Sequence, residues 1–268
     1  MKVHPFRFLT FLCFAVAPLQ AGLLLEMETS VPGQEDPEAL TMKLQGTKLK
    51  METPAIGGQQ ASLVFDAAKD ELLTIDHNRR QYFRFDSEQV EEMAAMIKSA
   101  REQMEQALAE VPAAQRPMIE RMMKNRMPDM PEPAPALQLE RTDETKEIAG
   151  YTATLVRVLS EAGKVADAWI VPQDEVEGGE QFSEVLGKFG DFMQELVSAV
   201  PQSGEGAQDL TRVLGQLNGI PVATTSYADG AVESSSILRN LSEADIPDSE
   251  FAVPAGYREQ KIEMPSMR

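Results

Sequence analysis

The feature that most constrains this chain is a series of short, half-apolar segments separated by turn residues. Between residues 22 and 86 the segments cover 23–29, 41–51, 62–66, 71–76 and 81–86. Apolar and polar side chains partly alternate along them, which is typical of strands with one face on a core and the other in water. Even spacing and short turns predict an antiparallel meander.

Two more groups of strands are expected further along the chain. The first covers 137–141, 146–148, 151–159 and 165–171, with Gly163 in the turn before the last segment. The second covers 220–227 and 232–241, and its Asp229-Gly230 pair is typical of a two-residue hairpin turn. A final extended stretch is expected at 251–257. All three strand groups together are needed to close one core.

Helical periodicity separates these groups. Asp86 or Ser87 can cap a helix, and apolar residues then follow at alternating spacings of three and four: Val90, Met93, Ile97, Ala100, Met104, Ala107 and Val111. Pro112 starts a second expected helix, completing a helical insert over about 87–127, and four prolines make 128–136 a connector. Further helices are expected at 182–200 and 210–217. This order predicts an α+β fold with a long antiparallel sheet and helices on one face.

The first 21 residues predict export. Lys2 and Arg7 precede an apolar run that is too short to span a bilayer, and Ala21 is a small residue at a cleavage position. Cleavage after Ala17 is the alternative. No small residue directly precedes Cys13, so the lipidation signal of a lipoprotein is not expected. We therefore expect a cleaved signal peptide at 1–21, a periplasmic or secreted protein, and a single domain over 22–268.

Charge limits the partners. The chain has 43 acidic and 25 basic residues, for a net charge of −18. Binding to nucleic acid depends on Lys and Arg, so nucleic acid is not an expected partner. No stretch after residue 21 reaches 18 apolar residues, so we expect no membrane-spanning segment.

Motifs for catalysis are scarce. His77 is the one histidine after the expected signal peptide, and its neighbours Asp76 and Asn78 predict a solvated turn. Without a second histidine or a further cysteine, we expect neither a zinc site of the usual kind nor a histidine-based triad. Phosphate-loop and dinucleotide-binding motifs are missing as well. The chain is therefore expected to be no enzyme and to hold no cofactor or metal.

Methionine is unusually concentrated, because eight of the 15 methionines lie between Met93 and Met130. Three interpretations are open: a helix core, a pliable apolar pocket, or a soft-metal site for Cu(I). Trp169 is in the same way either a core residue or part of a ligand platform. The pocket interpretation has six candidate lining residues: Met93, Ile97, Met104, Met118, Met122 and Trp169.

Several segments together resemble a bacterial family called domain of unknown function 4412 (DUF 4412). Residues 111–123 resemble its helical insert, 148–151 with 168–171 its central hairpin, and 219–222 with 251–257 its closing strands. Thr152 departs from it, since relatives often have cysteine there. The family in turn resembles the lipoprotein carriers of the LolA and LolB type. That resemblance implies a curved sheet forming a half-open barrel, helices on its concave face, and a periplasmic protein with an apolar concavity.

Three functional hypotheses follow from these observations. The first is non-enzymatic binding of a lipid or another apolar ligand between sheet and helices, driven by burial of alkyl surface. The second is a structural or protein-interaction module of the cell envelope, whose concavity is filled by its own helices. The third is a hydrolase that uses carboxylates.

Overall fold

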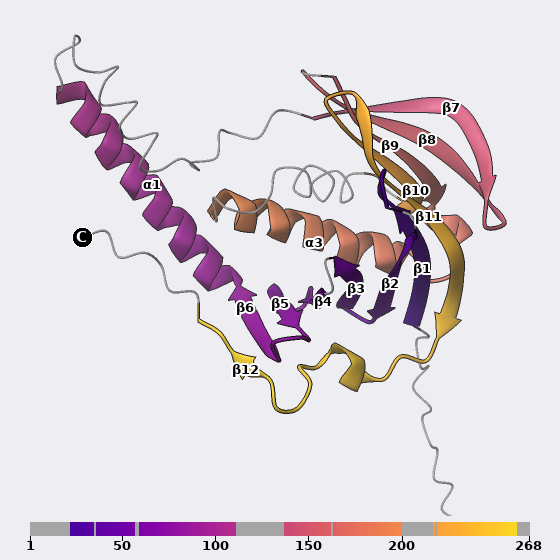
Figure 1. The fold of residues 1–268 in the computed structure, drawn as a ribbon, viewed down its shortest axis with the longest axis horizontal. Helices are drawn as coiled ribbons and strands as arrows, with labels where there is room; N and C mark the ends of the chain where they lie inside the picture. The colour runs from indigo at the N-terminus through magenta and orange to yellow at the C-terminus, as the bar shows by residue number, and fades with distance from the viewer. Residues whose placement is uncertain are drawn as a thin grey trace, which may run out of the picture.

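One 12-stranded sheet dominates the computed structural model, which describes residues 22–34, 36–56, 59–110, 137–161, 163–199, 217 and 219–261 (Figure 1). Its first six strands are β1 (Gly22–Ser30), β2 (Glu38–Gln45), β3 (Lys48–Ile56), β4 (Gln59–Asp66), β5 (Glu71–Asp76) and β6 (Gln81–Asp86). The others are β7 (Gln138–Ile148), β8 (Tyr151–Ser160), β9 (Gly163–Pro172), β10 (Gly219–Ala228), β11 (Ala231–Ala244) and β12 (Arg258–Glu259).

The strand order joins two meanders at the middle of the sheet. It runs β12-β6-β5-β4-β3-β2-β1-β11-β10-β9-β8-β7. Strands β1 and β11 pair antiparallel from Gly22 with Ala244 to Ser30 with Ser235, so the two halves of the chain meet there. Every pairing is antiparallel except that of β12 with β6.

A glycine turn divides one segment that the alternation predicted to be continuous. Residues 41–51 form the end of β2 and the start of β3, and Met42 pairs with Met51 across the hairpin. Gly46 has a φ of +58° in the turn between them. Glycine adopts this left-handed conformation without steric cost, so the chain reverses here. The expected five-stranded meander therefore has six strands.

Two α-helices lie among the described residues. The first, α1 (Ser87–Glu110), follows β6 directly, and the Asp86 carboxylate accepts a hydrogen bond from the Gln89 amide, as the capping pattern predicted. The second is α3 (Gly179–Ala199), close to the expected 182–200. Neither helix is long and apolar enough to cross a membrane, as far as the described residues go.

The main core lies between α3 and the sheet. Helix α3 contributes Phe182, Val185, Leu186, Phe189, Phe192 and Leu196, all buried. The Phe65 ring of β4 lies 5.5 Å from the rings of both Phe189 and Phe192. Because a fully buried side chain of this size contributes about 1.5–3 kcal/mol, this helix-to-sheet contact is a major source of stability.

The predicted fold class was wrong. The sheet is not closed into a barrel, because β7 and β12 are its two edges and each has a single neighbour. Nor do both helices cover a concave face: α1 contacts β6 and α3, and runs away from the sheet (Figure 1). The described residues form mostly β-strand, with two α-helices, in place of the expected α+β fold.

Several expected segments lie outside the described residues. They are the signal peptide at 1–21, the end of the helical insert, the connector at 128–136, and most of the helix expected at 210–217. Residues 251–257 were expected to be extended, but η2 (Asp248–Phe251) is a short 3-10 helix and only β12 pairs with the sheet.

Candidate functional site

A partly buried chain of hydrogen bonds gives the His77 side chain two partners that the sequence did not predict. The Nε2 atom of His77 is hydrogen-bonded to Ser62 Oγ at 2.7 Å, and its Nδ1 atom to the Tyr257 hydroxyl at 3.0 Å. Tyr257 also packs edge-on against the imidazole. His77 therefore lies in the predicted turn, but its half-buried imidazole is the centre of a hydrogen-bonded trio with Ser62 and Tyr257.

The trio resembles the arrangement of nucleophile, base and orienting group in a hydrolase. However, Ser62 is only 2% exposed, because it lies on β4 beneath the C-terminal segment. A nucleophile must reach the atom that it attacks, and this serine has no path to a substrate in the observed conformation. The arrangement instead satisfies three polar groups and fastens Tyr257 to the sheet.

A cluster of ion pairs lies beside the trio. The Lys43 amine of β2 is 2.8 Å from the Glu250 carboxylate and 3.3 Å from that of Glu52, and Lys50 is 2.7 Å from Glu52. Burial raises the pKa of Glu52, but the hydrogen bonds and charges of Lys50 and Lys43 outweigh it and lower the pKa overall. The hydrogen bond and charge of Lys43 lower the pKa of Glu250 as well. These carboxylates therefore stay charged in mild acid.

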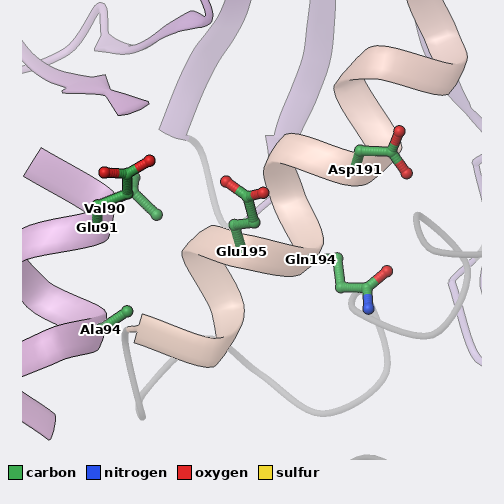
Figure 2. A pocket seen from close by; sticks show the side chains of 6 residues that line it. All are labelled: Val90, Glu91, Ala94, Asp191, Gln194 and Glu195. Atoms are coloured by element: carbon green, nitrogen blue, oxygen red, sulfur yellow. The ribbon is translucent and has the colours of Figure 1, made fainter. Parts of the chain in front are cut away.

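The two helices enclose a cleft of about 500 Å³ (Figure 2). Helix α1 contributes an apolar wall of Val90 and Ala94, and Glu91 and Glu195 face each other across the opening. Asp191 and Gln194 of α3 complete the lining. Three carboxylates around a partly apolar floor favour a cationic or basic group over a fatty-acid carboxylate.

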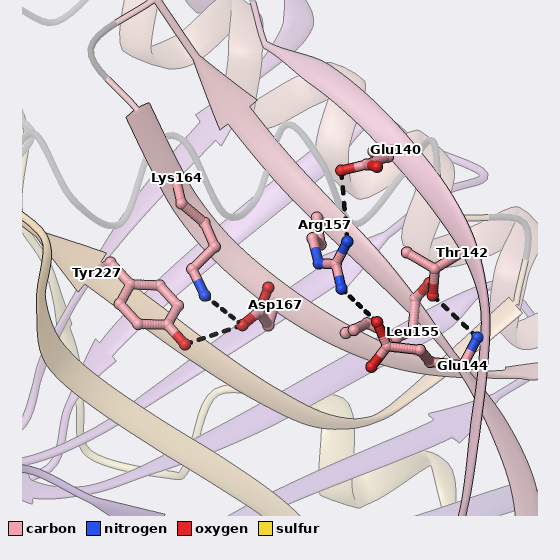
Figure 3. A network of polar contacts seen from close by, with 8 residues as sticks. All are labelled: Glu140, Thr142, Glu144, Leu155, Arg157, Lys164, Asp167 and Tyr227. Atoms are coloured by element: carbon pink, nitrogen blue, oxygen red, sulfur yellow. Dashed lines mark hydrogen bonds and ion pairs between the residues drawn. The ribbon is translucent and has the colours of Figure 1, made fainter.

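A second polar network crosses β7 to β10 (Figure 3). Asp167 accepts hydrogen bonds from Lys164 at 2.7 Å and from the Tyr227 hydroxyl at 2.8 Å, and the Lys164 amine lies 4.0 Å from the Tyr227 ring centroid. The Asp167 hydrogen bond is the main cause that raises the Lys164 pKa. Arg157 of β8 pairs with Glu140 and Glu144, both on the neighbouring strand β7. Every charge has an opposite partner, so this network fastens one hairpin to the next.

The structure describes the side chains of only two of the six predicted pocket residues, Met93 and Trp169. Met93 is buried in the main core and lines a cleft of about 270 Å³ with Arg84 and Lys261. Trp169 is half-buried, packs against the same core, and has the Lys146 amine 5.8 Å from its ring. The backbones of Ile97 and Met104 lie on α1, but their side chains, and the whole of Met118 and Met122, are outside the described residues.

Two carboxylates approach each other elsewhere on the surface. A hydrogen bond with Glu177, and the charge of that residue, raise the pKa of Glu243. Both side chains are exposed, and neither lines any of the clefts described above. A hydrolase that works with two carboxylates needs a cleft around them, so this pair does not favour that hypothesis. Among the described residues, no three side chains of His, Cys, Asp or Glu are grouped as a metal site.

Sequence reasoning missed the trio because its members are far apart in the chain. Ser62 and His77 are separated by 15 positions, and His77 and Tyr257 by 180. One signal was available: Ser62 occupies a position between apolar residues in a predicted strand, where a hydroxyl needs a partner.

Comparisons with known proteins add little to this geometry. No family model matches the chain, and no curated protein matches it. Among solved structures, one titled "Structure of PNGF-II in C2 space group" is similar, with 10% sequence identity and a TM-score of 0.43. The alignment covers 90% of this chain and 31% of that chain, so the chain spans less than a third of its length. A likeness of this size supports no conclusion about function.

Proposed function

We propose that this chain is a non-enzymatic protein-interaction module of the bacterial cell envelope. The observation that carries the proposal is the filled interior, where the Phe65 ring of β4 packs in a tilted arrangement against the rings of Phe189 and Phe192 of α3. Where the described helix and sheet meet, the protein's own aromatic side chains occupy the volume that an acyl chain would need. The envelope location rests on the predicted signal peptide.

The cleft between α1 and α3 is the contact surface that we propose for a partner. Its carboxylates Glu91, Asp191 and Glu195 are exposed, which suits a segment with basic side chains. The net charge of −18 strengthens the attraction of such a segment over longer distances.

Native mass spectrometry of protein purified from periplasm without detergent is the first test. We expect the mass of the polypeptide alone. A discrete excess mass that disappears on organic extraction would contradict the proposal and favour the apolar-ligand hypothesis. For that second hypothesis Met93 stays a candidate lining residue, although the cleft that it borders is lined mainly by charged and polar side chains such as Arg84, Glu92 and Lys261.

Chemical cross-linking in envelope preparations tests the contact surface. Replacing Glu91 and Glu195 by Lys reverses the charge of the cleft, so the yield of a cross-linked partner should fall at least about tenfold. Glu233→Lys, on the exposed tip of the β10–β11 hairpin, changes charge away from the cleft and serves as the control. Equal yields from all three proteins would place the contact elsewhere.

A further inference from the structure

The C-terminal segment 245–261 crosses the sheet on the side opposite the main core. Side chains alternate between faces along a strand, and Lys50, Val64 and Leu73 alternate with the core residues Leu49, Phe65 and Leu72. Residues of 245–261 cover this second face. Their regular structure is limited to η2 and the two-residue strand β12.

Apolar contacts form the inner layer of this covering. Ile246 and Phe251 are buried against Val64, Leu73 and Ile75 of β4 and β5. Val253, Tyr257 and Tyr82 pack around this cluster. Without the segment, an apolar patch on three neighbouring strands would face solvent.

Charged side chains hold the outer layer. Glu250 pairs with Lys43 and Lys50, Asp248 with Lys48 at 2.7 Å, and Glu259 with Arg84 at 3.4 Å. Most of these side chains are at least one-fifth exposed, so dissolved ions reach them and screen their attraction. The backbone ladders of β2 to β6 do not depend on ion pairs in this way. Salt therefore weakens the covering segment more than the sheet beneath it.

We propose that residues 245–261 are a strap that opens as one unit, while the sheet stays folded, when its ion pairs are screened or neutralised. This inference rests on the proposed function, because opening exposes an additional apolar surface on an interaction module. The Ser62–His77–Tyr257 trio and the two backbone hydrogen bonds of β12, from Arg258 to Arg80 and from Gln260 to Tyr82, mark the far end of the strap.

Low pH weakens the same ion pairs between the strap and the sheet that salt screens. The charged and titratable groups that face the strap come from β2 to β6 and the turns between them: Lys43, Lys48, Lys50, Glu52, Asp66, Lys69, Glu71, His77, Tyr82 and Arg84. Lys48 lowers the pKa of Asp248 and Lys43 that of Glu250, and protonation of these two carboxylates removes the negative partner from their ion pairs. Opening is therefore favoured at low pH and opposed at neutral pH.

Hydrogen–deuterium exchange of the purified protein, resolved by peptide, tests the strap. Glu250→Gln removes the partner of two lysines with little change of shape, and Glu233→Gln is the matched control on an exposed hairpin tip. We expect amides of 245–261 to exchange about two- to fivefold faster in Glu250→Gln at neutral pH, since partly exposed ion pairs contribute up to about 1 kcal/mol. Wild-type protein in about 0.5 M sodium chloride should show the same acceleration. Amides of β4 and β5 should keep their protection in each case.

Two results would overturn the proposal. One is unchanged exchange in 245–261 in both the variant and high salt. The other is equal acceleration in β4 and β5, which would mean that the sheet opens together with the segment. The readout requires no partner, so a strap that opens in a protein with no cross-linked partner would refute the interaction module and leave the strap intact.

Discussion

Phe65 is the single residue on which the main core depends most directly. It is 1% exposed, and its ring touches two rings of α3. Truncation to alanine leaves a cavity that the surrounding sheet cannot close, so Phe65→Ala should lower the free energy of unfolding by about 3–5 kcal/mol. Urea denaturation measures the loss. Met96→Ala, at a helix position that is 48% exposed, should change stability by less than about 0.5 kcal/mol.

Gly46 offers a test of backbone conformation alone. No atom lies within 4 Å of the position that its Cβ would occupy, so a side chain there meets no steric obstacle beyond its own backbone. Gly46→Val should cost about 1–2 kcal/mol, because a β-branched residue strongly disfavours a positive φ. Gly46→Asn should cost less, since asparagine tolerates this conformation. Thermal unfolding of both variants separates the two outcomes, and equal losses would point to packing instead.

Single residues also show which features can be predicted from local sequence and which cannot. The pair Asp229-Gly230 predicted its hairpin turn correctly, because both residues need a positive φ and the signal is local. The interpretation of His77 was correct about the turn but missed the partners of its side chain. Its backbone does lie in a turn, but Ser62 and Tyr257 reach its side chain from distant parts of the chain.

At the scale of elements, the ion pairs between β2, β3 and the strap make stability depend on pH. Glu52 and Glu250 have pKa values below the ordinary 4.5, so their pairs stabilise the folded protein above that pH. The stabilisation is lost as pH falls through the lowered values of the folded state. We expect the free energy of unfolding to decline from about pH 5 downwards, and Glu52→Gln to make that decline shallower.

Equilibrium unfolding at a series of pH values checks this dependence. Glu161→Gln, in the exposed turn after β8, is the control and should follow the wild-type curve. A curve of the same slope for Glu52→Gln would assign the acid sensitivity to other carboxylates.

Elements with a strong local pattern were predicted well. The helix now seen as α3 was expected within a few residues of its bounds, because its apolar spacing follows one helical face. The final stretch was not, since residues 251–257 read as a strand by composition but bind the sheet mainly through side chains. Periodicity reports which face is apolar, and it does not report whether backbone ladders form.

At the scale of the whole molecule, the sheet must protect an open edge. Among the described residues, strand β7 has β8 as its one strand neighbour. Charged residues along it, such as Asp143, Lys146 and Glu147, discourage pairing with a second copy. Glu147→Val should therefore increase association at high protein concentration, measured by light scattering. Glu233→Val, away from this edge, should stay at the wild-type molecular mass.

The overall topology was the part that the sequence could not predict. Strand segments were expected in nearly the right places, but their order in the sheet depends on which distant edges meet. Pairing of Leu25 with Leu241 joins residues more than 200 positions apart, and no local pattern indicates that contact. The expected half-open barrel came from a resemblance, and the open order of the strands corrected it.

The central pairing of β1 with β11 also determines at what stage of synthesis the sheet can be completed. A ribosome or a translocation channel delivers β1 near the beginning and β11 near the end. Until β11 has been made, the side of β1 that will pair with it has no partner strand. Closing so long a loop is slow compared with forming local hairpins, so the last step of folding is the meeting of the two halves. A chain arranged in this way cannot complete its sheet until β11 has been synthesised, so the pairing of β1 with β11 comes late in folding.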